Sequence, residues 1–227
     1  MERQKDELSL QKDDLLRQKD MLLNEVQHRV ANSLQIIAGI ILSKASTVSS
    51  EEARLLLQDT HDRVISMATV QQQLNASGII GPIEMVPYLT RLSDALATSM
   101  IGESRPVKMK VAGAGGSLSS RQAESIGLIT TELVMNALKH AFPGENMKGQ
   151  INIAYDVDGT DWKLSVADNG VGRPDGVFAQ PKTGLGTGIV KALAQELNAK
   201  VETLAAPGGT TVSITHATFA NPKIQAA

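Results

Sequence analysis

The first third of the chain has the hydrophobic spacing of long helices. Leucines recur at Leu8, Leu15 and Leu22, within a sequence that repeats every seven residues over 3–23. A period of seven predicts a coiled coil. The second seam position of the repeat holds Gln or Lys, so we expect the helices to pair weakly and adjustably. The alternative for a repeat of about three heptads is a charged, solvated single helix.

The helical pattern then continues without a break. Apolar side chains follow at steps of three or four residues, which keeps them on one side of a helix: Leu23, Val26, Val30, Leu34, Ile37 and Ile41. After a short polar turn, a second apolar stripe over 56–74 predicts another helix, with Ser49 and Glu52 at capping-box spacing. Such a hairpin is too thin to bury its stripes alone. We therefore expect a homodimer in which two hairpins form a four-helix bundle.

From Pro82 onward the pattern changes to helices mixed with alternating strands. We expect helices over 84–100, 121–141 and 189–198, and strands over 107–111, 150–157, 162–167, 200–204 and 210–215. Helices beside a largely antiparallel sheet indicate a two-layer α/β sandwich. The whole chain is therefore of the α+β class, with the helical segments first.

Glycine and proline divide the chain in the same way. Residues 1–77 contain one of the 19 glycines and none of the 8 prolines. We accordingly expect five parts, which are a coiled-coil signal helix (1–23), a dimerising hairpin (24–77), a linker (78–82), a globular domain (83–218) and a C-terminal tail (219–227).

Composition and charge exclude several classes of function. The chain has 22 basic and 24 acidic residues, a net charge of −2 and 3% aromatic residues, which argues against a nucleic-acid partner. We find no run of about 18 apolar residues and no signal peptide, so we expect no membrane segment. The absence of cysteine excludes disulfides and thiolate chemistry and fits a cytoplasmic protein.

A histidine on the first helix has polar neighbours suited to chemistry. Glu25 and Asn32 are three residues before and four residues after His28, so the three share one helix face. A carboxylate could hold one ring nitrogen while the other acts as a nucleophile, and a carboxamide could orient a water or a phosphoryl oxygen. A lone helical histidine is more often simply solvated. His61, on the second helix, is interpreted as such a surface residue.

The long helix over 121–141 carries a second polar stripe. Glu132, Asn136, Lys139 and His140 face one way, and they offer a carboxylate, a neutral oxygen ligand and cations. Nucleotide-bound Mg²⁺ prefers oxygen ligands and keeps waters and phosphates in most positions, so Asn136 with Glu132 nearby would suffice. Lys139 or His140 could meet a phosphate. The alternative is a helix that shows its polar side to solvent.

Two glycine-rich segments complete a possible nucleotide site. Asp168 ends a strand and can accept the amino protons of adenine, and Gly170 and Gly172 would let the backbone approach the base. Further along, alternate glycines precede a helix and could cradle phosphates with their backbone N–H groups. This second segment contains Gly184, Gly186, Thr187 and Gly188. It matches neither the P-loop nor the Rossmann fingerprint.

These motifs, in this order, resemble the core of a two-component sensor histidine kinase. Residues 25–34 resemble the phosphoacceptor box of the HisKA_2 subfamily, which is related to the HWE kinases, and 132–142, 168–172 and 184–188 resemble the N, G1 and G2 boxes. The resemblance implies a phosphotransfer hairpin followed by a HATPase_c domain of the Bergerat (GHKL) fold. Such a protein uses ATP and Mg²⁺ to phosphorylate its own histidine and passes the phosphoryl group to an aspartate in the receiver domain of a response regulator.

Matched residue by residue, the resemblance makes His28 the phosphoacceptor, Asn136 the Mg²⁺ ligand and Asp168 the adenine-reading carboxylate. The glycines frame the nucleotide and its lid, and Thr211 sits where a threonine assists adenine binding.

The chain departs from the family pattern in three places. Arg29 follows the histidine where the largest kinase subfamily has an acidic residue, so Glu25 is our candidate for orienting His28, with Glu132 its competitor. The lid over 171–183 is short and has Phe178 as its one aromatic residue. The strand from Trp162 lacks the Trp-x-Glu signature of HWE kinases, which favours HisKA_2.

The seven-residue repeat predicts an input role for the first helix. We expect it to connect to a sensor domain that is absent from this chain. Two other functions stay open on the sequence. One is a non-catalytic dimeric phosphotransfer or scaffold module with a degenerate ATP site. The other is a GHKL serine kinase of an anti-sigma-type partner, a class that lacks a histidine-bearing hairpin.

Overall fold

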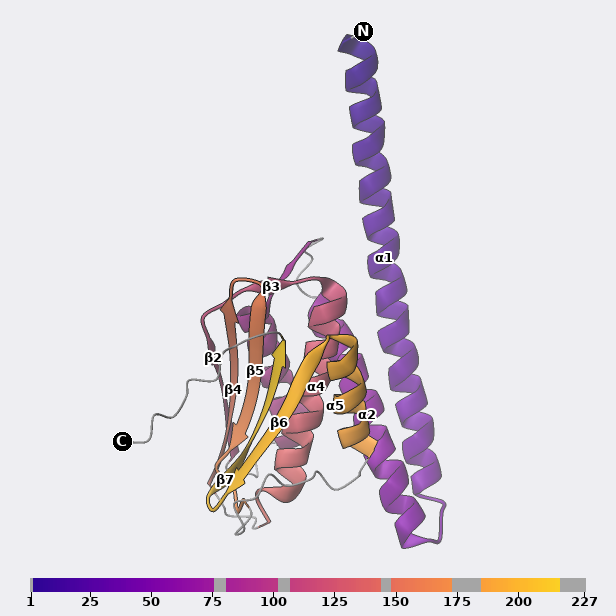
Figure 1. Cartoon of the computed structure of the whole chain (residues 1–227). Coiled ribbons are helices and arrows are strands. Elements are labelled where there is room, and N and C mark those ends of the chain that lie inside the picture. The colour runs from indigo at the N-terminus through magenta and orange to yellow at the C-terminus, as the bar shows by residue number, and fades with distance from the viewer. Residues whose placement is uncertain (1, 76–80, 102–106, 144–147, 173–184, 217–227) are drawn as a thin grey trace, which may run out of the picture. The chain divides into compact units, whose positions relative to one another are not determined.

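A computed structural model describes residues 2–75, 81–101, 107–143, 148–172 and 185–216 (Figure 1). The chain divides into two compact units, Met1–Ile80 and Gly81–Ala227, which we call the helical unit and the sheet unit. Each is described by itself. Within the described residues, no helix combines the length and the apolar character needed to cross a bilayer.

The helical unit is a hairpin of two helices, α1 (Glu2–Ala45) and α2 (Glu51–Asn75). The helix α1 is continuous over all 44 residues, as the unbroken apolar pattern predicts. Its buried positions recur every seven residues at Ala31, Ala38 and Ala45, with exposed fractions of 2% or less. A column of small side chains lets the two helix backbones approach closely.

The start of α2 differs from the prediction by one residue. The capping residue is Ser50, whose Oγ accepts from the N–H of Ala53 at 3.4 Å and whose carbonyl accepts from the N–H of Arg54 at 2.9 Å. The expected capping box of Ser49 and Glu52 is therefore wrong. By residue type alone, the two adjacent serines are equally good capping residues. The geometry of the turn selects Ser50.

A long apolar stripe of α1 lies away from α2. Residues of an α-helix advance by about 100° each, so the centre of this stripe is roughly 120° around the helix axis from the column of Ala31, Ala38 and Ala45. The large apolar side chains on it are exposed to between 44% and 66%, and they are Leu15, Leu22, Val26, Val30, Ile37 and Ile40. The helix α1 thus buries its alanines and leaves these six large side chains uncovered.

The larger sheet of the sheet unit has five strands in the order β2-β4-β5-β7-β6. Their bounds are β2 Val107–Gly113, β4 Gly149–Asp158, β5 Asp161–Asp168, β6 Ala199–Ala206 and β7 Gly209–His216. All neighbouring pairs are antiparallel except β2 and β4, which are parallel. The expected largely antiparallel sheet is confirmed, with β4 paired to β5 and β6 paired to β7. The parallel pair joins strands on either side of a long helix, which local patterning does not reveal.

Helices cover one face of this sheet, as Figure 1 shows for α4 and α5. The helices are α3 (Met85–Leu96), which continues into a π-helical turn at Ala97–Ile101, α4 (Ser120–His140) and α5 (Leu185–Glu196). Two short strands, β1 (Ile83–Glu84) and β3 (Ser117–Leu118), pair beside them. The α/β two-layer sandwich is therefore confirmed.

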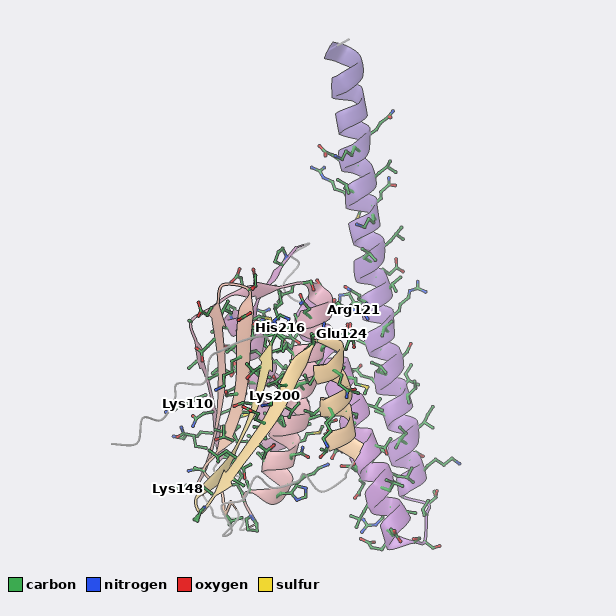
Figure 2. All side chains as sticks on the ribbon, viewed as in Figure 1. Lys110, Arg121, Glu124, Lys148, Lys200 and His216 are labelled. Atoms are coloured by element: carbon green, nitrogen blue, oxygen red, sulfur yellow. The ribbon has the colours of Figure 1, made fainter. Side chains whose placement is uncertain are left out.

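The core lies between the helices and the covered face. Alternate residues of β4 and β5 are buried there, with Ile151, Ile153 and Leu164 at 1% exposure or less. At the end of β5 remote from Asp168, the Trp162 ring stacks on the His216 ring with centroids 5.6 Å apart; Figure 2 labels His216. Small and polar residues occupy the other face, as alternation along the strands requires.

Helix starts follow capping chemistry. The helix α4 begins after Ser119, whose side chain forms a capping box with Gln122, so the helix expected over 121–141 is present. The helix α5 begins at Leu185, four residues before the expected Ile189. Its glycines lower helix propensity, and packing against α4 and β6 overrides that preference.

Candidate functional site

The chemistry of the sheet unit gathers where β5 ends. Asp168 is the last residue of β5 and is half-buried. Its Oδ1 accepts from the N–H of Gly170 at 2.9 Å and from the N–H of Thr210 at 3.3 Å. Burial raises the pKa of the Asp168 carboxyl, and these backbone N–H bonds partly oppose that rise. The carboxylate is thus held at a fixed place on the covered face of the sheet.

The threonine beside Asp168 is Thr210. In the register of β5 and β7, Asp168 lies opposite Thr210, whereas Thr211 lies opposite Ala167. Because successive side chains of a strand alternate between faces, Thr211 is on the face of the sheet away from Asp168. The sequence pattern pointed to the neighbouring threonine. The two threonines are adjacent, and only the pairing register distinguishes them.

The glycines after Asp168 are required by packing within the protein. A β-carbon on Gly170 would lie 2.3 Å from the carbonyl oxygen of Ala141, at the end of α4. One on Gly172, where φ is +57°, would lie 1.9 Å from the carbonyl oxygen of Ala206. The loop is therefore fixed between α4 and the turn that joins β6 to β7. The sequence suggested that these glycines admit the base; in the structure they admit the protein's own backbone.

The same contact brings the polar stripe of α4 to the end of β5. The N–H of Val171 donates to the carbonyl of Ala141 at 2.9 Å. Asn136 is five residues, or about 7.5 Å, earlier along the axis of α4. Asn136 is half-buried, Glu132 is 5% exposed, and Lys139 and His140 are exposed in the last turn.

The first turn of α5 lies beside this stripe. Arg121, which Figure 2 labels near the start of α4, donates through Nη2 and Nε to Glu196 at the end of α5, at 2.6 and 2.9 Å. The two helices pack antiparallel, so Leu185, about 16 Å back along α5, is level with the region of Glu132 to Asn136.

The glycine segment itself is partly described. Gly186 is buried, Thr187 is half-buried and Gly188 is exposed. A β-carbon placed on Gly188 would have no other atom within 4 Å. These residues belong to the first turn of α5, whose N–H groups have no partner inside the helix. Gly184, Phe178 and most of the expected lid lie outside the described residues.

The helical unit carries the remaining candidates on α1. His28 and Asn32 are exposed. His28 makes no hydrogen bond or ion pair with any residue that the structure describes, whereas Glu25 binds Arg29, with Nη2 and Nε of Arg29 at 2.6 and 3.2 Å from Oε1. His61, on α2, contacts Asp62 at 3.3 Å.

An oxygen-ligated cation fits the donor set of α4. In the described parts of the chain, no group of three or more His, Asp or Glu side chains could hold a metal ion by itself. The donors on α4 are instead one carboxamide and one carboxylate a turn apart. This is the sparse set that suits Mg²⁺ when phosphates and waters supply its other ligands.

Comparisons with known proteins match two families in succession along the chain. Residues 25–100 match the family described as histidine kinase (HisKA_2), and residues 122–219 match histidine kinase-, DNA gyrase B- and HSP90-like ATPases (HATPase_c). The sensor histidine kinase PdtaS of Mycobacterium tuberculosis is 30% identical over 169 residues, which are 74% of this chain and 33% of PdtaS. The chain thus spans about a third of that relative's length.

A second curated relative and a solved structure agree. The blue-light-activated histidine kinase 2 of Erythrobacter litoralis is 27% identical over 84% of this chain and 55% of that protein. The histidine kinase domain of EL346 from Erythrobacter litoralis has a TM-score of 0.59 at 22% identity, covering 85% of this chain and 95% of the other, which shows the shared fold. The chain belongs to the histidine kinases and consists of a HisKA_2 domain followed by a HATPase_c domain.

Proposed function

We propose that this chain is a sensor histidine kinase core that transfers the γ-phosphoryl group of ATP to His28 and then to an aspartate of a response regulator receiver domain. The observation that carries the proposal is the Asp168 carboxylate, held by two backbone N–H groups beside the end of α4 and level with Thr210. A HATPase_c domain implies ATP binding, and the HisKA_2 match supplies the histidine.

In this proposal the carboxylate of Asp168 accepts the amino protons of adenine, since an ionised carboxylate has only acceptor oxygens. Thr210 takes the role that the family resemblance assigns to Thr211, because it shares a face with Asp168. The first turn of α5, with Gly186, Thr187 and Gly188, offers N–H groups and the positive end of the helix dipole to the phosphates.

Asn136 would hold Mg²⁺, with the Glu132 carboxylate one turn away. When bound, the ion supplies charge neutralisation at the phosphate oxygens. Lys139 and His140, in the last turn of α4, offer an ammonium group and a ring nitrogen to the same phosphates. The protein's contribution is to hold the nucleotide in position, and positioning and electrostatics account for most of phosphoryl-transfer catalysis.

The transfer step begins with a neutral imidazole, and its atoms and electrons balance. The lone pair of one His28 ring nitrogen forms a bond to the γ-phosphorus while the bond from phosphorus to the β,γ-bridging oxygen breaks, and ADP leaves with that electron pair. The other ring nitrogen keeps its proton, so the phosphorylated ring is cationic until that proton departs. In the second step a receiver carboxylate oxygen attacks the phosphorus and the imidazole leaves.

We also propose a homodimer through the exposed stripe of α1. Leu15, Leu22 and Ile37 belong to one face that runs from the predicted coiled coil past His28. A second copy would cover these side chains and complete a four-helix bundle. The face that carries His28 lies on the other side of the alanine column, so such a dimer leaves the imidazole accessible.

Labelled ATP with Mg²⁺ tests the proposed function. We expect acid-labile, base-stable phosphate on the wild-type chain, none on His28→Ala, and full labelling of the matched control His61→Ala, since His61 is on α2. Label that persists in His28→Ala contradicts the phosphoacceptor assignment. Acid-stable label would indicate a hydroxyl kinase, and a chain that binds no ATP at millimolar concentration would be a scaffold.

A further inference from the structure

The carboxylate expected to orient His28 is engaged elsewhere. Both hydrogen bonds from Arg29 end on Oε1 of Glu25, at 2.6 Å from Nη2 and 3.2 Å from Nε. Along an α-helix, His28 is about 60° around the axis from Glu25, and Arg29 is about 40° from Glu25 on its other side. The Glu25 side chain therefore lies between a base and a guanidinium, and it binds the guanidinium.

The surroundings contain few other charges. The hairpin determines which part of α2 packs at the level of His28. Its short turn at residues 46–50 places residue 28 near residue 68. Between Arg63 and Asn75, α2 has no charged residue. Arg63 is itself paired with Asp59 at 3.1 Å. Of the described side chains at this level of the two helices, Glu25 and Arg29 are thus the charged ones within one turn of His28.

We propose that Arg29 withholds Glu25 from His28 until a phosphoryl group arrives, and that the arginine then exchanges the carboxylate for the phosphoryl oxygens. A guanidinium pairs with phosphate in the same forked geometry that it uses for carboxylates, so the two anions compete for it. The released carboxylate accepts a hydrogen bond from the N–H of the imidazole. Arg29 thus contacts the transferred group itself and also positions, through Glu25, the nucleophile that is one residue away along the chain.

The exchange serves the transfer step at two points. Glu25 bound to one ring nitrogen keeps the proton there, which leaves the lone pair of the other nitrogen free to attack. Once the phosphorus–nitrogen bond has formed, the ring carries a positive charge that the carboxylate balances. The inference deepens the proposed function and rests on it for the phosphoryl step, but the resting pair is a property of the protein without nucleotide.

Nuclear magnetic resonance of the nucleotide-free full chain, at high pH where imidazoles are neutral, tests the resting pair. The chain has four histidines, so the ¹⁵N and ¹H signals of His28 can be identified with His28→Ala. The variants are Arg29→Met, Glu25→Gln and the double variant, all with residues of good helix propensity. The informative quantity is the change in the tautomer ratio of the His28 ring that Arg29→Met causes in the wild-type background, compared with the change that it causes in the Glu25→Gln background.

We expect Arg29→Met to shift the neutral ring about twofold toward the tautomer whose N–H faces Glu25 at low salt, and only when Glu25 is present, which is the size given by a charge pair on an exposed helix. A tautomer ratio that Arg29→Met changes equally in the two backgrounds, or not at all, overturns the proposal. Arg29→Lys should behave nearly as the wild type, because an ammonium also holds the carboxylate.

Autophosphorylation tests the exchange itself. We expect Arg29→Met to lower kcat about tenfold with the KM for ATP unchanged within twofold, and Arg29→Lys to recover part of the rate. An unchanged kcat in Arg29→Met on a chain that labels His28 overturns the exchange. If the wild-type chain itself leaves His28 unlabelled, the proposed function fails, while the tautomer ratio of His28 still decides whether Arg29 holds Glu25.

Discussion

Adding one methyl group at Gly170 should push the loop that follows Asp168 away from the end of α4. A β-carbon there would lie 2.3 Å from the carbonyl oxygen and 2.4 Å from Cβ of Ala141. Both distances are far below a van der Waals contact, and the closest atom belongs to the backbone, which cannot rotate away. In Gly170→Ala the loop must move off the end of α4.

The magnitude follows from the contacts that are lost. Overpacking of this kind costs about 1–3 kcal/mol. Moving the loop also strains the hydrogen bond from the N–H of Val171 to Ala141, worth about 1 kcal/mol. We therefore expect Gly170→Ala to lower the free energy of unfolding of the sheet unit by about 3 kcal/mol. Gly188→Ala is the matched control, since its β-carbon meets no atom within 4 Å and alanine favours the helix by up to about 1 kcal/mol.

Urea unfolding followed by tryptophan fluorescence measures this difference in one unit alone. Trp162 is the single tryptophan of the chain and is 3% exposed in the core of the sheet unit. Its emission therefore reports that unit and not the helical hairpin. The reasoning is refuted if Gly170→Ala unfolds at the same urea concentration as Gly188→Ala, because the steric contact with Ala141 would then carry no cost.

Three further predictions concern the site and its frame. Asp168→Asn should weaken ATP binding about 100-fold or more in calorimetry, because a charge-assisted bond is lost and an amide donor faces the adenine amine. In the wild type, burial raises the pKa of Asp168. The affinity for ATP should therefore be full above that pKa and fall as the pH drops through it. Thr210→Val should weaken binding about fivefold and Thr211→Val should not, and the reverse order would refute the register argument. A double-mutant cycle on Arg121 and Glu196, followed by Trp162 fluorescence, should give a coupling of about 0.5 kcal/mol, as for other exposed pairs, and a zero coupling would show that this contact does not hold α5.

Much of the helical unit could be predicted because its pattern is local. Helical periodicity depends on residues three, four and seven positions apart, so Leu15, Leu22 and Val26 suffice to predict one continuous helix. The predicted cap of α2 is one residue early, at Ser49, because both serines satisfy the local rule. The pairing of Glu25 with Arg29 is also local, yet spacing alone allows Glu25 to reach either His28 or Arg29.

Local patterns in the sequence were enough to establish the kinds of element, the division into a helical and a sheet unit, and the chemical groups of the candidate site. How strands distant along the chain pair was settled only by the folded protein. That pairing made β2 parallel to β4, set Thr210 rather than Thr211 beside Asp168, and pressed Gly170 against Ala141. A local pattern reports which face a residue prefers, whereas register and close backbone contacts are set by packing between elements, where a shift of one residue reverses every side chain.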